Sequence, residues 1–151
     1  MTDRPADPFV VAVGALRRKE RAAVELAEWL RRRGYGDGEV DATLARLVEA
    51  GELDDERFAR RYAEDKRALR GWGSERIRAG LASRGIAEPL IEAALEADFD
   101  ELARAAALLA SRNRPLADEP DRARALGFLT RRGYGYEIAH EAIRRATKRA
   151  A

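Results

Sequence analysis

Three Arg-Gly pairs that end an apolar-periodic segment, each with a leucine four residues before the glycine, recur in this chain of 151 residues, at Gly34, Gly85 and Gly133. The intervals between these glycines are 51 and 48 residues. Each glycine closes a segment with the apolar spacing of an amphipathic helix, and each is followed by Tyr or Ile and a second such segment. Glycine commonly ends helices at this place. A period near fifty residues therefore predicts stacked helical units, each too small to bury its own apolar face.

The apolar residues between these glycines predict further helices. Helices are expected near residues 8–18, 53–69, 74–84, 88–96, 120–132 and 136–149. Three more are expected: one that ends at Gly34, one that ends at Gly51, and one that begins at Asp98 or Asp100. No stretch alternates between polar and apolar residues as a half-buried strand does. The predicted fold is all-α, an elongated tandem array of three-helix repeat units with a short last unit.

The repeat also predicts where the units begin and end. The expected segments are an N-terminal tail with the start of the first helix (1–13), repeat 1 (14–70), repeat 2 (71–114) and repeat 3 (115–151). On this division, residues 71–73 (Gly-Trp-Gly) lie at a junction between units and set the curvature of the array. Stiffening this junction by Gly71→Pro is then expected to weaken partner binding more than local folding.

Several classes of function find no support in the composition. The chain has no cysteine and a single histidine, His140, so neither a disulfide framework nor a transition-metal site is expected. Its three serines lie outside any nucleophile-elbow pattern, and no glycine-rich phosphate loop is present. No apolar run approaches the length of a membrane span, and the N-terminus does not resemble a signal peptide. The expectation is a soluble cytoplasmic protein that is not an enzyme and uses no cofactor or metal.

Charge is unevenly distributed along the chain. The net charge is only +2, but residues 14–36 carry +4, residues 37–100 carry −6 and residues 101–151 carry +5. Two basic ends around an acidic middle favour a large partner with complementary charge, although solvated helix faces explain most charge runs.

Arginines gather in short clusters near helix ends, and two explanations remain open for them. They can balance the helix dipole, or they can form a discontinuous basic track that contacts phosphates. Trp72, between two glycines, is the aromatic residue most readily placed on a surface. The candidate residues for contact with a partner or with DNA are Arg32, Arg33, Arg57, Arg60, Arg61, Arg67, Arg70, Trp72, Arg76, Arg78, Arg131, Arg132, Arg144 and Arg145.

Residues 53–86 contain Leu-Asp-Asp-x-Arg-Phe at 53–58, Gly-aromatic-Gly at 71–73 and Arg-Ile-Arg at 76–78. This pattern resembles the RecX family, regulators of the RecA recombinase, and the resemblance extends more weakly over residues 14–149. It implies three tandem three-helix units in an elongated arc. It also implies binding along the groove of a RecA–DNA filament and inhibition of the ATPase, strand-exchange and coprotease activities of RecA, within recombination, DNA repair and the SOS response.

One position departs from the family pattern. Family members often have serine where this chain has Ala22, before the Glu-Leu of the second helix. Loss of such an N-cap costs about 1 kcal/mol, so the first two helices are expected to run together.

The favoured hypothesis is a monomeric, non-enzymatic modulator of RecA that binds the RecA filament on DNA and does not bind membranes. A free-standing DNA-binding helical repeat protein is the alternative, and a scaffold for another protein is a third.

Overall fold

The computed structural model describes residues 6–97 and 100–150. Residues 1–5 of the expected tail and Asp98, one of the two expected caps, lie outside this part. Within the described residues the chain forms nine α-helices and one short π-helix, with no β-strand, which confirms the predicted all-α class. The elements are α1 (Pro8–Arg18), α2 (Ala23–Arg32), α3 (Asp37–Glu49), α4 (Asp55–Asp65), the π-helix η1 (Lys66–Arg70), α5 (Ser74–Ser83), α6 (Glu88–Glu96), α7 (Glu101–Ser111), α8 (Glu119–Arg131) and α9 (Tyr136–Ala150).

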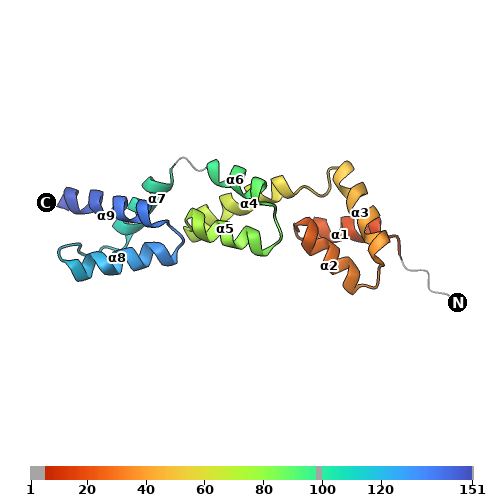
Figure 1. Cartoon of the computed structure of the whole chain (residues 1–151), viewed down its shortest axis with the longest axis horizontal. Helices are drawn as coiled ribbons and strands as arrows, with labels where there is room; N and C mark the ends of the chain where they lie inside the picture. Colours follow the sequence, from red (N-terminus) through yellow and green to blue (C-terminus); the bar gives the residue numbers. More distant parts are fainter. Residues whose placement is uncertain (1–5, 98–99, 151) are drawn as a thin grey trace.

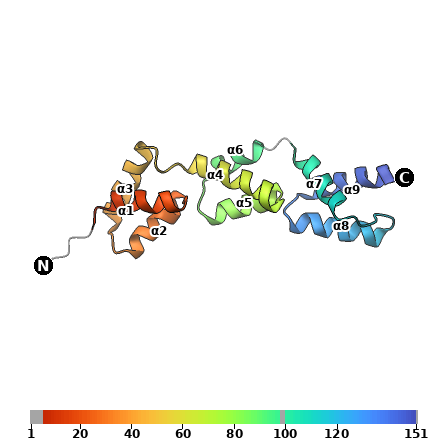
Figure 2. The ribbon, with the colours of Figure 1, turned by 180° about the vertical axis from the view of Figure 1, so that it is seen from behind.

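The helices form three bundles that follow one another in a row (Figure 1), and the view from behind shows the same order (Figure 2). Each bundle has its own apolar core, centred in turn on α1–α3, on α4–α6 and on α7–α9. The repeated leucines Leu30, Leu81 and Leu129 are each fully buried, one in each core. The elongated tandem array expected from the sequence is therefore confirmed.

The apolar cores divide the helices differently from the predicted boundaries at residues 70 and 114. Phe58 and Ala63 of α4 pack in one core with Ile77 of α5, so α4 belongs with the second bundle. Leu109 of α7 packs in the core of α8 and α9, so the last bundle has three helices. Periodicity marks the apolar face of a helix but not the neighbour that covers it. For this reason the repeat unit was placed one helix out of step.

Residues 71–73 lie inside the second bundle and also touch the third. The backbone N–H of Gly73 donates to the carbonyl oxygen of Arg132 at 2.8 Å, and that of Glu75 donates to Gly133 at 2.8 Å. This contact between α5 and the end of α8 is called the second joint. Gly71 has φ +65°, which proline cannot adopt. Gly71→Pro would therefore disrupt local folding as well, so it does not separate folding from binding.

The first joint connects the first and second bundles at the start of α2. Here α1 and α2 stay separate, contrary to the expectation from Ala22. The N–H of Ala22 donates to Glu25 Oε1 at 3.2 Å, and the N–H of Ala23 donates to Asp55 Oδ1 of α4 at 2.8 Å. The carboxylate of Asp55, in the next bundle, thus accepts from an N–H group in the first turn of α2, as an N-cap side chain would.

Both joints use the same arrangement. The start of the second helix of one bundle lies against the glycine turn that follows the second helix of the next. A Cβ atom on Gly85 would lie 2.8 Å from Val24 of α2, and one on Gly133 would overlap Arg76 of α5. The regular succession of bundles therefore comes from a repeated contact at these turns.

None of the described helices combines the length and apolar character needed to cross a bilayer.

Gly73→Ala tests the second joint. Its φ of −87° suits any residue, but a Cβ there would lie 2.6 Å from backbone atoms of Gly133 and Tyr134. We expect the change to lower the free energy of unfolding by about 1–3 kcal/mol, as overpacking does, measured by urea denaturation. The control is Gly38→Ala in α3, where a Cβ would meet no described atom within 4 Å. Equal stability of the two variants would contradict the close contact.

Candidate nucleic-acid interface

A basic cavity of about 490 Å³ lies at the second joint. It is lined by Lys66, Arg70, Trp72, Arg76, Phe128, Arg131 and Arg132. The second bundle supplies the first four of these residues and α8 with its C-terminal turn supplies the rest. The lining of this joint cavity contains five cationic side chains, two aromatic rings and, among the described residues, no carboxylate.

Local structure brings these side chains together. Lys66 and Arg70 stand at the two ends of η1, and the N–H of Trp72 donates to the carbonyl oxygen of Lys66 at 3.2 Å. Arg76 lies in the first turn of α5. The backbone contact of the second joint then places Arg131 at the end of α8 opposite this group, since the Arg76 guanidinium donates to the Arg131 carbonyl at 3.4 Å.

Aromatic faces hold three of the cations in place. The guanidinium carbon of Arg76 lies 4.3 Å from the centre of the Trp72 ring, and Lys66 Nζ lies 4.8 Å from it. The guanidinium carbon of Arg132 lies 4.7 Å from the centre of the Phe128 ring. A cation–π contact orients a cation without cancelling its charge. These positive charges therefore remain available to an anion.

The hydrogen bond of Arg132 is also with a neutral group, since its guanidinium donates to the carbonyl oxygen of Arg70 at 3.3 Å. Next to the cavity, the Tyr134 hydroxyl donates to the carbonyl oxygen of Gly71 at 2.9 Å. No ion pair to a described carboxylate is found for any of the five cations. The cavity thus concentrates positive charge that the described chain leaves uncompensated.

A second hollow, of about 720 Å³, continues the joint cavity along α8 and shares Phe128 and Arg131 with it. Its further lining includes Arg112, Arg114 and Arg124. Burial, and then the charges of Arg114, Arg124 and Arg131, lower the pKa of the Arg112 guanidinium. Asp121 pairs with Arg124 at 2.6 Å and neutralises that one cation. We call the two hollows together the basic groove.

Five of the candidate residues from the sequence therefore meet in one place: Arg70, Trp72, Arg76, Arg131 and Arg132. Lys66, Phe128, Arg112, Arg114 and Arg124 were missed. A signal was available for Phe128, which precedes Arg131 by three residues and Arg132 by four, the spacing of neighbours on one helix face.

Several candidates instead make contacts within the protein. Arg57 and Arg61 each lie 3.6 Å from Glu20 Oε1, across the first joint. Arg67 donates to the carbonyl oxygen of Ala94 at 3.0 Å, which ties α6 to η1. These three arginines hold helices together.

Arg78, Arg144 and Arg145 are paired with carboxylates of their own bundle. Arg78 bonds to Glu88 and, at 2.6 Å, to Glu92. The hydrogen bond between Arg78 and Glu92 raises the pKa of the guanidinium and lowers that of the carboxyl. Arg144 and Arg145 both pair with Glu141, Arg145 at 2.8 Å.

The remaining candidates lie away from the groove. The guanidinium carbon of Arg33 lies 4.1 Å from the centre of the Trp29 ring, and Arg32 donates to the carbonyl of Glu28 at 3.4 Å, both in the first bundle. Arg60 is exposed on α4. Whether these residues contact a partner stays a prediction.

The basic groove suits a nucleic acid strand. Guanidinium groups match phosphate geometry, and aromatic faces beside a positive groove are a common way to bind single strands. Within the described residues, no group of three or more potential metal-binding side chains lies close enough together to hold an ion.

Comparisons with known proteins agree on one family. Residues 54–95 match the family model of the RecX second three-helix domain, which corresponds to α4–α6. The regulatory protein RecX of Chromohalobacter salexigens is 31% identical over 148 residues, 97% of each chain. That of Halorhodospira halophila is 40% identical over 127 residues, 82% of this chain and 78% of the relative. The crystal structure of RecX from Lactobacillus salivarius has a similar fold, with a TM-score of 0.81 and 18% identity over 91% of this chain and 93% of its own.

Arg131→Gln tests the crowding of charge in the groove. Because Arg131 is one of the cations that lower the pKa of Arg112, its neutralisation should relieve repulsion in the free protein. We expect the free energy of unfolding to stay unchanged or to rise by up to about 0.5 kcal/mol, measured by urea denaturation at low salt. Arg124→Gln, which loses a pair with Asp121, should instead lower it slightly. A loss above about 1 kcal/mol in Arg131→Gln would show a structural role.

Proposed function

We infer the function from family membership, because the chain belongs to the RecX family of regulatory proteins. We propose that it is a non-enzymatic regulator that binds along the RecA–DNA filament and inhibits the recombinase, ATPase and coprotease activities of RecA. It would act as a cytoplasmic monomer in recombination, DNA repair and the SOS response.

The basic groove at the second joint is the observation that carries this proposal. The five cations of its joint cavity make no ion pair with a described carboxylate, and two aromatic rings hold three of them in place. A filament offers a row of phosphates to such a surface, and binding them releases counterions. The groove would then be the part of the protein that contacts DNA.

The rest of the array supports contacts with protein. The net charge of +2 is small for a protein that binds through DNA alone. Three bundles in a row (Figure 1) form a long surface, which can reach more than one subunit of a filament. Residues 37–100 carry a net charge of −6 and residues 101–151 one of +5, so successive segments of the chain differ in sign. Such complementarity gives specificity and orientation.

The double variant Arg70→Glu/Arg131→Glu tests the filament proposal. Hydrogen bonds to charged groups contribute about 1.5–3 kcal/mol each, so half-inhibition of RecA ATPase on single-stranded DNA should require at least about 10-fold more protein. Arg70 and Arg131 are both exposed, so folding should be preserved.

The matched control is Arg18→Glu/Lys148→Glu, which makes the same change of net charge at two exposed positions outside the groove. It should inhibit nearly as well as the unchanged protein. If the unchanged protein leaves RecA ATPase and filament stability unaffected, the proposed function is wrong. If both double variants lose inhibition equally, the groove is not the contact.

DNA binding without RecA is the second candidate function, and the five cations of the joint cavity favour it. If each contacts one phosphate of a single strand, log K should fall with log salt with a slope of about −3.5, since each contact contributes roughly 0.7. Fluorescence anisotropy with a labelled oligonucleotide between about 50 and 200 mM salt measures this slope. Arg70→Glu/Arg131→Glu should reduce its magnitude by about 1.4 or more. Tight binding to RecA filaments with negligible affinity for naked DNA would exclude this candidate.

A further inference from the structure

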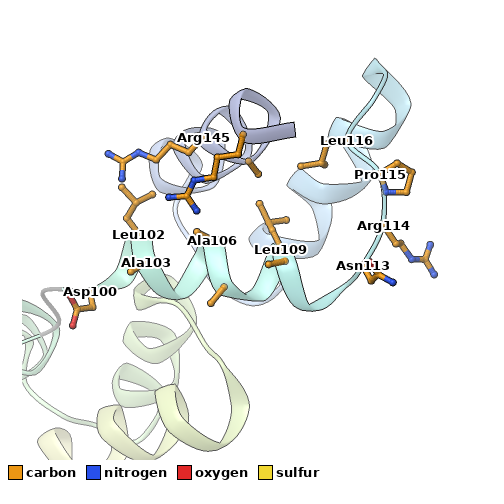
Figure 3. Close-up of a pocket in the computed structure, with 14 residues that line it drawn as sticks. Asp100, Leu102, Ala103, Ala106, Leu109, Asn113, Arg114, Pro115, Leu116 and Arg145 are labelled. Atoms are coloured by element: carbon orange, nitrogen blue, oxygen red, sulfur yellow. The ribbon is translucent and has the colours of Figure 1, made fainter. Parts of the chain in front are cut away.

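An apolar groove of about 1030 Å³ runs along α7 in the third bundle (Figure 3). Its sides are formed by the end of α9 and by residues 113–116. Leu102, Ala106 and Leu109 of α7 face this space together with Leu116 and Ala146. We call it the α7 groove.

Small side chains keep the α7 groove open. One side of α7 carries only small exposed side chains, those of Ala103, Ala107 and Ala110. A longer apolar side chain at any of these positions would fill the space. Leu102 and Leu116 are only partly buried. Apolar surface of this kind in a hollow commonly marks an interaction site.

The rim of the α7 groove is basic. Arg114, Arg145 and Arg149 line it, whereas Asp100 at one end of α7 is its only lining carboxylate among the described residues. Arg145 is partly neutralised by Glu141, but no ion pair to a described carboxylate is found for Arg114 or Arg149. An occupant with an apolar face and flanking negative charges fits both the floor and the rim.

We propose that the α7 groove binds an acidic amphipathic helix of a partner protein. The stretch of α7 from Leu102 to Ala110 is about 12 Å long, since a helix rises roughly 1.5 Å per residue. That length accommodates about two turns of a helix whose apolar residues recur at positions i, i+3 or i+4 and i+7, the usual form of helix-in-groove recognition. Carboxylates beside this stripe meet Arg114 and Arg149.

This inference is independent of the proposed function, because it concerns another surface and another kind of ligand. Only Arg114 lines both grooves. The tests therefore use Arg149 and Ala107, which belong to the α7 groove alone.

The probe is a fluorescein-labelled peptide of about 14 residues, roughly 21 Å long when helical, with leucines on one face and glutamates on the other. Anisotropy is measured with the full chain. A scrambled peptide of the same composition and a peptide with lysine in place of glutamate should bind at least about tenfold more weakly, since both the apolar stripe and the charge contribute.

Two variants test the site. Ala107→Glu places a carboxylate on the floor of the groove and should weaken binding at least about tenfold, because it sets like charge against the acidic peptide. Arg149→Glu should weaken it about fivefold through the rim. The matched controls are Ala79→Glu on the exposed side of α5 and Lys148→Glu beside Arg149 on α9. Both should bind as the unchanged protein does, and thermal unfolding of each variant checks that it is folded.

Each of four results would overturn the proposal. The first is that the anisotropy of the acidic peptide does not change up to about 1 mM protein. The second is that the three peptides bind with equal affinity. The third is that Lys148→Glu weakens binding of the acidic peptide as much as Arg149→Glu does. The fourth is that sedimentation detects self-association of the unchanged protein and that Ala107→Glu abolishes it. A second copy of the chain would then occupy the groove.

Discussion

The arrangement of the three bundles depends on a backbone contact in which the start of one helix meets the end of another. The first N–H groups and the last carbonyl groups of a helix have no partners within that helix. At the second joint the N–H groups of Gly73 and Glu75 donate to the carbonyls of Arg132 and Gly133, and the N–H of Ser74 donates to Glu101 Oε1 at 2.9 Å. Each end thus satisfies the other, with helix dipoles in a favourable sense. Glycine at 73 and 133 is required because any Cβ would collide with backbone at that distance.

The same contact decides where positive charge accumulates. Arg131 and Arg132 stand at the C-terminal end of α8, where cations are favourable and need no further explanation. Arg76 stands in the first turn of α5, where a cation is unfavourable for the helix. Packing the two ends together adds repulsion between their charges. Helix-end balance therefore explains part of the cluster but not Arg76, and the proposed nucleic-acid ligand would supply a compensating negative charge there.

The sequence predicted the helices well because their apolar spacing and terminal glycines are local signals. It placed the unit boundaries one helix out of step, since the apolar face of α4 carries no mark of the partner that covers it. No local pattern indicated that Gly73 occupies the N-cap position of α5 and that the third bundle supplies the acceptors for the first N–H groups. The expectation from Ala22 failed for a related reason, because Asp55, which accepts from the N–H of Ala23, lies 32 residues after Ala23 in the chain. At the site, the arginines were visible individually, but their convergence depends on contacts between residues about sixty positions apart, such as Tyr134 with Gly71.

The two joints share one geometry but differ in charge. In each joint, the arginine before the glycine turn lies near the third residue of the helix that it meets. At the first joint these residues are Arg84 and Glu25, which form an ion pair at 3.0 Å. At the second joint the same positions hold Arg132 and Arg76, both cations. A joint whose charges form an ion pair is therefore sufficient to connect two bundles. A carboxylate at the position of Arg76 would also stabilise the helix N-terminus better than a cation does. The arginine at this place, together with Lys66 and Arg70, adds positive charge that the first joint does without, which supports the proposal that the second joint contacts a polyanion.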